Sequence, residues 1–221
     1  AAHKKKMNTI DYSSIVKQAI EQLRKDVKEE GHSWRYEHTH QGVEVKSTNR
    51  SQGETRIPVY KAKGVIAAPS EDILHKAILC TEAIKKWSSV VDIEIIHTEN
   101  ETKYPGFQLY RQKHRPVLGG LVSPRDFAIC RSYHMEENGE IFLVCFSVED
   151  DRIPEDWNFV RGHLHMVACH MMPIPDQPGH CVTQYLVHTD IKGWLPAAIV
   201  SRGVLEEMTT TYERIANIVK V

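Results

Sequence analysis

An arginine on an otherwise apolar strand face is the first feature of this sequence that could do chemistry. The segment entered through residues 123–126 has a two-residue period that places Phe127, Ile129, Arg131 and Tyr133 on one face. A guanidinium stays protonated, and stripping it of water costs on the order of several kcal/mol unless a partner satisfies it. Arg131 is therefore either in a surface ion pair or on a solvated face, or it binds the hydroxyl or carbonyl of an apolar ligand inside a pocket.

Asp92 is the candidate acidic partner of Arg131. It lies in the apolar run 90–96, where Val91, Ile93 and Ile95 form the more apolar face and Asp92 lies on the other. This parity favours Arg131 over Asp92 as a group that faces an apolar pocket.

Two histidines offer a different chemistry. His163 and His165 stand two residues apart on one strand face, a spacing that can bind a metal ion. A catalytic metal needs a third ligand; His180 and His188 are the conceivable donors, whereas His170 has the opposite parity. Because the chain has 13 histidines, such a pair also arises by chance. A metalloenzyme is thus an alternative, but we predict no metal and no cofactor.

Nucleophilic and acid–base chemistry have little support in the sequence. It contains no Gly-x-Ser-x-Gly and no carboxylate pair that can be placed at a cavity, so a cyclase or hydrolase is the weaker reading. No Cys-x-x-Cys occurs, and the odd, widely spaced cysteines are typical of reduced, buried residues in an intracellular protein. They are Cys80, Cys130, Cys145, Cys169 and Cys181. We predict no catalytic residues.

Composition narrows the class further. The 221 residues carry 28 basic and 29 acidic side chains, a formal charge of -1, so no global attraction to nucleic acid or to an anionic membrane is expected. No apolar run approaches the roughly 18 residues of a membrane-spanning helix. We expect residues 1–10 to be a disordered tail or an expression remnant, residues 11–221 to form one domain, and the protein to be cytoplasmic.

The elements that must position these residues follow from periodicity. A helix is predicted from a cap at Asp11 or Ser13 to a stop at Gly31, three strands between residues 34 and 68, and a helix from the cap Ser70 toward Trp87. Six strand-like runs follow at 90–98, 107–112, 126–134, 141–148, 164–172 and 181–188. Because strands and helices do not alternate regularly, we predict an α+β fold whose antiparallel sheet curls around a terminal helix.

The terminal helix is predicted from Pro196, which is tolerated in a first turn, to Val221. One apolar stripe runs along it, formed by Val200, Val204, Met208, Tyr212, Ile215 and Val219. Such a stripe fits a helix docked on a core, and it fits equally a helix that covers a ligand cavity.

Three ordered motifs resemble one known family. Residues 121–127 (Leu-Val-Ser-Pro-Arg-Asp-Phe) followed by Arg131, residues 160–162 (Val-Arg-Gly) and residues 190–196 (Asp-Ile-Lys-Gly-Trp-Leu-Pro) are similar to the steroidogenic acute regulatory protein-related lipid transfer (START) family, from about Ser13 to the C-terminus. The resemblance implies a helix-grip fold with a deep internal lipid tunnel, intracellular lipid binding without enzymatic chemistry, and a C-terminal helix that acts as a gate.

The resemblance also assigns residues. In sterol-binding members, an acidic residue in the strand after a tryptophan meets, inside the tunnel, an arginine that follows the Pro-Arg-Asp-Phe motif. The arginine corresponds to Arg131 in this sequence. The acidic residue corresponds to Asp92 if a one-residue gap is placed after Trp87. Predicted cavity-lining residues are Phe127, Ile129, Tyr133, Tyr185, Met208 and Tyr212. Predicted gate and membrane-contact residues are Lys192, Trp194, Leu195 and Arg202.

The predicted function is non-enzymatic lipid binding and transfer by a monomer that touches membranes transiently. A sterol is the favoured ligand, because an acid and an arginine together suit one hydroxyl. A carotenoid or other hydroxylated isoprenoid, or a phospholipid, remains an alternative ligand, and a lipid sensor or scaffold remains an alternative to a carrier.

Overall fold

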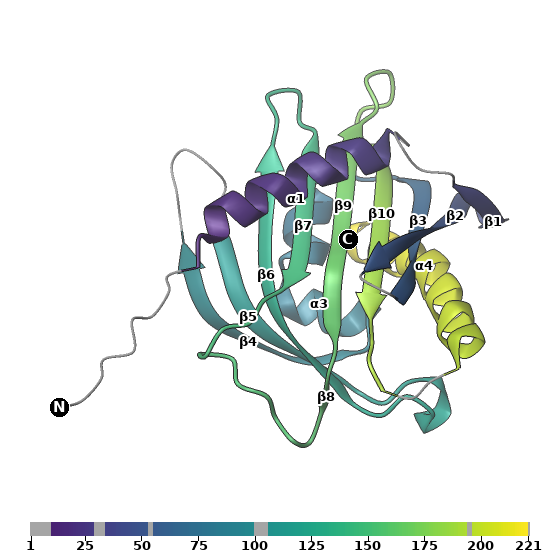
Figure 1. The fold of residues 1–221 in the computed structure, drawn as a ribbon. Helices are drawn as coiled ribbons and strands as arrows, with labels where there is room; N and C mark the ends of the chain where they lie inside the picture. The colour runs from purple at the N-terminus through teal and green to yellow at the C-terminus, as the bar shows by residue number, and fades with distance from the viewer. Residues whose placement is uncertain (1–9, 29–33, 53–54, 100–105, 194–195, 221) are drawn as a thin grey trace.

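The computed structural model describes residues 10–28, 34–52, 55–99, 106–193 and 196–220. Within these residues one sheet of ten strands has the order β1-β2-β3-β10-β9-β7-β6-β5-β4, and β8 pairs with β6 (Figure 1). The strands are β1 (Arg35–His40), β2 (Val43–Gln52), β3 (Thr55–Ile66), β4 (Val90–Glu99), β5 (Phe107–His114), β6 (Arg125–Met135), β7 (Ile141–Ser147), β8 (Val160–Arg161), β9 (His163–Pro173) and β10 (Cys181–Asp190). All pairings are antiparallel except the two-residue contact of β8 with β6.

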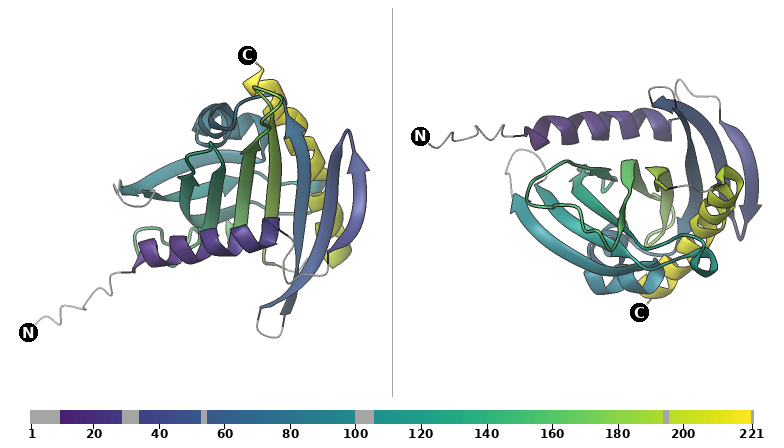
Figure 2. Two further views of the ribbon diagram at one scale, coloured as in Figure 1. Left: turned by 90° about the horizontal axis from the view of Figure 1, so that it is seen from above. Right: turned by 60° about the horizontal axis from the view of Figure 1, so that its bottom comes forward.

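The first helix covers the outer face of the sheet. Helix α1 (Tyr12–Val27) begins at Asp11, whose carboxylate accepts a hydrogen bond from the Ser14 backbone N–H at 3.1 Å, as a cap at Asp11 predicts. Its buried face, which includes Val16 and Leu23, packs against outward-facing apolar residues of β5, β6, β7 and β9. The helix crosses these strands on one side of the sheet (Figures 1 and 2).

The last helix lies on the opposite, inner face (Figure 2). Helix α4 (Ala197–Val219) buries Met208, Tyr212 and Ile215 in the inner core, so the predicted apolar stripe is confirmed. The Tyr212 hydroxyl lies 2.9 Å from the carbonyl oxygen of Ala62 on β3 and 2.7 Å from that of Thr183 on β10. These contacts attach the middle of α4 to two neighbouring strands. The fold is therefore α+β, a curved antiparallel sheet around a long C-terminal helix.

The segment 70–87 differs from the single helix predicted there. It consists of α2 (Ser70–Asp72), the π-helix η1 (Ile73–Ile78) and α3 (Thr81–Trp87). Ser70 is not the cap: Pro69 is, and the Ser70 hydroxyl instead donates to the Gly139 carbonyl at 2.9 Å. The π-turn ends in a bond from Leu79 N to Leu74 O. Sequence periodicity missed this break because buried apolar residues continue across it.

Candidate functional site

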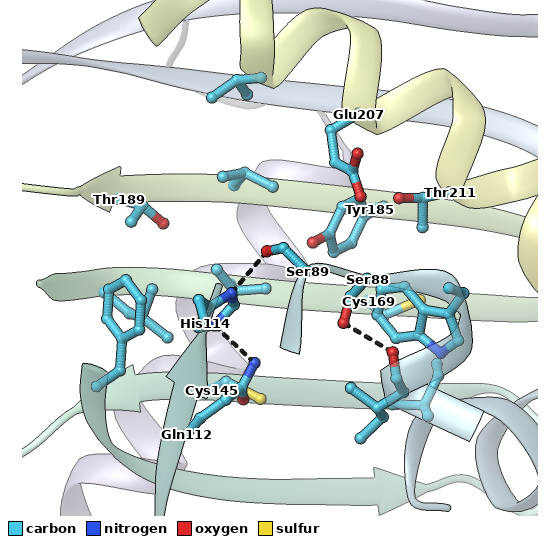
Figure 3. A pocket seen from close by; sticks show the side chains of 18 of the residues that line it. Ser88, Ser89, Gln112, His114, Cys145, Cys169, Tyr185, Thr189, Glu207 and Thr211 are labelled. Carbon is cyan, nitrogen blue, oxygen red and sulfur yellow. Dashed lines mark hydrogen bonds between the residues drawn. The ribbon is translucent and has the colours of Figure 1, made fainter. Parts of the chain in front are cut away.

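A cavity of about 540 Å³ lies between the inner face of the sheet and α4 (Figure 3). Residues of β5, β6, β9, β10, α3 and α4 line it. Phe127, Ile129, Tyr185 and Tyr212 are among them, where the sequence placed them. The wall is mainly apolar with a few polar groups, which is the usual make-up of a site for a small apolar ligand.

Arg131 lies in this cavity wall and is only 5% exposed. Its Nη1 donates to the Ile78 carbonyl at 3.1 Å and its Nη2 to Gln108 Oε1 at 2.7 Å, while the guanidinium lies 5.0 Å from the centre of the Tyr110 ring. Among the described residues Nε has no hydrogen-bond partner. The Ile78 carbonyl is available because it ends the π-helix. Neutral oxygens thus hold a buried cation in an apolar cavity.

Asp92 does not join Arg131. Its side chain is 53% exposed, its nearest ion-pair partner is Lys113 at 3.9 Å, and it is not part of the cavity wall. The prediction that the two side chains meet in the cavity is wrong. Asp92 is on the edge strand β4, and its register partner is Lys113 on β5. The Asp92 side chain is open to solvent there. The alternation of residues 90–96, which places Asp92 on the less apolar face, predicted that it would not face the cavity. The match to the family motif predicted the opposite.

Two predicted lining residues also lie outside the cavity wall. Met208 is 1% exposed and packs within the inner core. Tyr133 continues the face of Phe127, Ile129 and Arg131, but its ring lies against His75, with 6.5 Å between ring centres. Strand periodicity correctly places Tyr133 on the inner face, but the cavity does not extend to the end of β6 where Tyr133 lies.

The predicted gate residues are only partly described. Lys192 is exposed, and its Nζ lies 2.6 Å from Asp190 Oδ2; Arg202 is exposed on α4. Trp194 and Leu195 lie outside the described residues. A membrane contact by these four residues stays a prediction.

A polar group in the cavity wall escaped the sequence analysis. Ser89 Oγ lies 2.8 Å from His114 Nδ1, and Gln112 Nε2 lies 3.0 Å from His114 Nε2 (Figure 3). Burial, together with the charge of Arg115, lowers the pKa of His114 to about 4. The signal was the alternation of Gln108, Tyr110, Gln112 and His114 along one strand, which share a face with period two.

The Pro-Arg-Asp-Phe motif has a structural explanation. Arg125 donates to the carbonyls of Ile191 at 3.1 Å and Lys192 at 3.0 Å, so it holds the turn between β10 and α4. Asp126, fully buried, accepts two bonds from Arg161 at 2.9 and 2.8 Å. The motif therefore joins β6 to the start of the terminal helix and to β8.

The glycine of Val-Arg-Gly serves the cavity wall. A Cβ on Gly162 would lie 2.2 Å from Cε1 of Phe127. A side chain at position 162 would therefore displace a ring that lines the cavity.

The histidine pair belongs to a different place. The rings of His163 and His165, and of His165 and His188, have centres 4.6 Å apart, and all three line a hollow beneath α1 on the outer face. Within the described ranges no group of three or more His, Cys, Asp or Glu side chains is arranged to hold a metal ion. None of the described helices is long and apolar enough to cross a membrane.

A curved sheet that holds a long C-terminal helix over an apolar cavity defines a helix-grip protein with an internal cavity. The profile of the START domain matches residues 14–215, and the chain belongs to this family.

Relatives and solved structures agree with this assignment. Human StAR-related lipid transfer protein 5 is 27% identical over 164 residues, which cover 73% of this chain and 75% of that protein. The mitochondrial steroidogenic acute regulatory protein of Danio rerio is 23% identical over 167 residues, covering 72% of this chain and 56% of that protein. The solved structure of human StAR-related lipid transfer protein 5 superposes with a TM-score of 0.81 at 23% identity, over 95% of this chain and 97% of that one. The crystal structure of human STARD10 superposes with a TM-score of 0.72 at 22% identity, over 90% of this chain and 78% of that one.

Proposed function

We propose that this protein binds one lipid in the cavity beneath α4 and carries it between membranes, without catalysing a reaction. The observation that carries the proposal is the apolar cavity of about 540 Å³ with the buried Arg131 in its wall. Membership of the START family and the similarity to proteins named lipid transfer proteins support it.

The energetics of burial are sufficient for this function. Enclosing about 500 Å² of apolar ligand surface at about 25 cal/mol per Å² provides about 12 kcal/mol before the costs of association and ordering. No covalent bond to the ligand is needed.

We favour a sterol as the ligand. The cavity volume suits one compact, rigid lipid better than a phospholipid with two long acyl chains. Arg131 offers one concentrated polar spot, and a hydroxyl there can bind the guanidinium directly or through water. The cavity volume and Arg131 support this choice; Asp92 does not, because it lies outside the cavity wall.

Release of an enclosed lipid requires a wall to open, and α4 is the candidate gate. Val200, Val204 and Tyr212 of α4 line the cavity, and the turn at 191–193 leads into this helix. Rotation of a packed helix about a short turn is a common gating motion. We propose that contact with a membrane surface near Lys192, Trp194, Leu195 and Arg202 triggers it.

A vesicle assay tests the function directly. Donor vesicles carrying a fluorescent sterol are mixed with acceptor vesicles, and the transfer rate is measured with and without the protein. Val187→Phe, which fills part of the cavity, is expected to reduce binding and transfer. Val65→Phe is the matched control, because Val65 is 55% exposed on β3 and away from the cavity.

Three outcomes separate the alternatives. Transfer that Val187→Phe abolishes and Val65→Phe preserves supports a cavity carrier. Sterol binding without transfer would contradict the carrier function and favour a lipid sensor. Transfer unaffected by Val187→Phe would overturn the proposal that the ligand occupies this cavity.

A further inference from the structure

The cavity wall contains a second polar group, separate from Arg131. It consists of Ser89, which directly precedes β4, and of Gln112 and His114 on β5. Figure 3 shows the three side chains converging in the cavity wall, with His114 between the other two. Nothing in the proposed transport mechanism yet uses them.

The hydrogen bonds within this group determine what it can offer to a ligand. The amide nitrogen of Gln112 can only donate, so His114 Nε2 accepts. The proton of the neutral imidazole is then on Nδ1, which donates to Ser89 Oγ. In the part of the chain that the structure describes, one hydrogen-bond donor and one acceptor of this group have no protein partner. The donor is the hydroxyl hydrogen of Ser89, and the acceptor is the carbonyl oxygen Oε1 of Gln112.

One donor and one acceptor, held at the same imidazole, match a ligand hydroxyl. A hydroxyl accepts from the Ser89 O–H and donates to Gln112 Oε1. A carboxylate or phosphate monoester oxygen has no hydrogen to give to Oε1. Of the two arginines nearby, Arg125 is already bound to backbone carbonyls and Arg115 is exposed. The group is therefore suited to an uncharged oxygen.

The two polar spots lie far apart along the cavity. Gln108, which binds Arg131, and Gln112 are four residues apart on β5, and His114 is two residues further. At about 3.3 Å per residue these separations correspond to about 13 and about 20 Å between Cα atoms. On the neighbouring strand, Ile129 lies between the two spots and Phe127 lies opposite Gln112. A rigid apolar body with an oxygen at each end would satisfy both spots at once.

We infer that Ser89, His114 and Gln112 form a second ligand-binding subsite that recognises an uncharged hydroxyl. The inference rests on the proposed function and deepens it. The cargo is then an isoprenoid lipid oxygenated at both ends, such as a sterol with a hydroxyl at the end of its side chain, in preference to a sterol with one hydroxyl.

The test compares two probes on the intact chain. Dissociation constants are measured for cholesterol and for the same sterol carrying one more hydroxyl at the end of its side chain. The wild type is expected to bind the dihydroxy sterol about tenfold more tightly, the effect of one or two ordinary hydrogen bonds. Ser89→Ala and Gln112→Leu should each remove this preference, because each deletes one of the two groups that bind the second hydroxyl. Thr189→Val, another polar position in the wall, should keep the preference.

Each outcome is decisive. Equal affinity of the wild type for both sterols, or a preference that survives in Ser89→Ala and Gln112→Leu, overturns the subsite and leaves the proposed function intact. Failure of the wild type to bind either sterol overturns the sterol ligand and the subsite together.

If the two variants do not fold, NMR of the His114 ring in the wild type replaces them. The dihydroxy sterol should shift its resonances more than cholesterol does, because only the second hydroxyl binds the neighbouring Ser89 and Gln112 side chains. Equal shifts would overturn the inference.

Discussion

Gly193 lies against the guanidinium of Arg125: a Cβ added at Gly193 would be 2.9 Å from Arg125 Nη2. Gly193 has a φ of +85°, a region that glycine occupies without strain. The same guanidinium donates to the carbonyls of the two preceding residues. One side chain of β6 thus holds the turn that leads into α4.

Gly193→Ala is expected to loosen this turn. The left-handed conformation costs about 1–2 kcal/mol for a residue with a Cβ, and the methyl group also displaces Arg125. We expect a lower free energy of unfolding in denaturant titrations and faster lipid transfer between vesicles. Gly120→Ala is the control, since Gly120 has a φ of +91° and open space around it. Equal effects of both variants on transfer would contradict a role of the Arg125 contact.

Gly162→Ala should disturb the cavity wall through Phe127. The added methyl group overlaps the ring, and such overpacking costs about 1–3 kcal/mol. Combined with Phe127→Leu, the loss of stability should be smaller than the sum of the two single losses. Strict additivity in this double-mutant cycle would show that the two residues do not interact as described.

Asp126→Asn should be among the most destabilising conservative changes. The carboxylate is fully buried and binds Arg161 through both oxygens, and removing one partner of a buried pair costs about 3–5 kcal/mol. Asp92→Asn is the matched control, expected to cost below about 1 kcal/mol because its pair with Lys113 is exposed. Thermal or denaturant unfolding of both variants measures the difference. Asp92→Asn should also leave lipid binding unchanged, and a loss would restore Asp92 to the site.

Arg131→Leu should weaken sterol binding. Hydrogen bonds to a charged group contribute about 1.5–3 kcal/mol, so the dissociation constant should rise about 10- to 100-fold. Tyr133→Phe, on the same strand face but outside the cavity wall, should bind normally. Unchanged affinity of Arg131→Leu for every lipid tested would remove Arg131 from the ligand site.

Acid should destabilise the fold through histidines whose pKa values are lowered by burial. The pKa values of His114 and His188 are lowered from 6.5 to about 4, in both cases mainly by burial. Above pH 6.5 these groups are neutral in both states and cost nothing. As the pH falls from about 6.5 to about 4, the unfolded chain binds protons that the folded chain does not, so the free energy of unfolding decreases.

His114→Gln should reduce the decrease over that range, because it removes one of the groups that cause it. Denaturant unfolding of the variant and the wild type, measured at several pH values, gives both curves. Identical curves for His114→Gln and the wild type would contradict a lowered pKa of His114 in the folded protein.

Local patterns were sufficient for the larger features of this protein. The apolar stripe of residues 200–219, the strand-like runs and the absence of strand–helix alternation indicated an antiparallel sheet around a terminal helix, because these signals depend only on the period of each element. The two-residue period also placed Phe127, Ile129 and Arg131 on one face, and all three line the cavity.

Only the tertiary structure decided which polar groups share the cavity. Ser89, Gln112 and His114 meet because of the antiparallel register of β4, β5 and β6, and that register depends on contacts between segments that no single-strand pattern contains. For the same reason Asp92, correctly placed on a strand, faces Lys113 on the open side of an edge strand. The π-helix that frees the Ile78 carbonyl for Arg131 is likewise a product of packing, since burial continues through it without a change of composition.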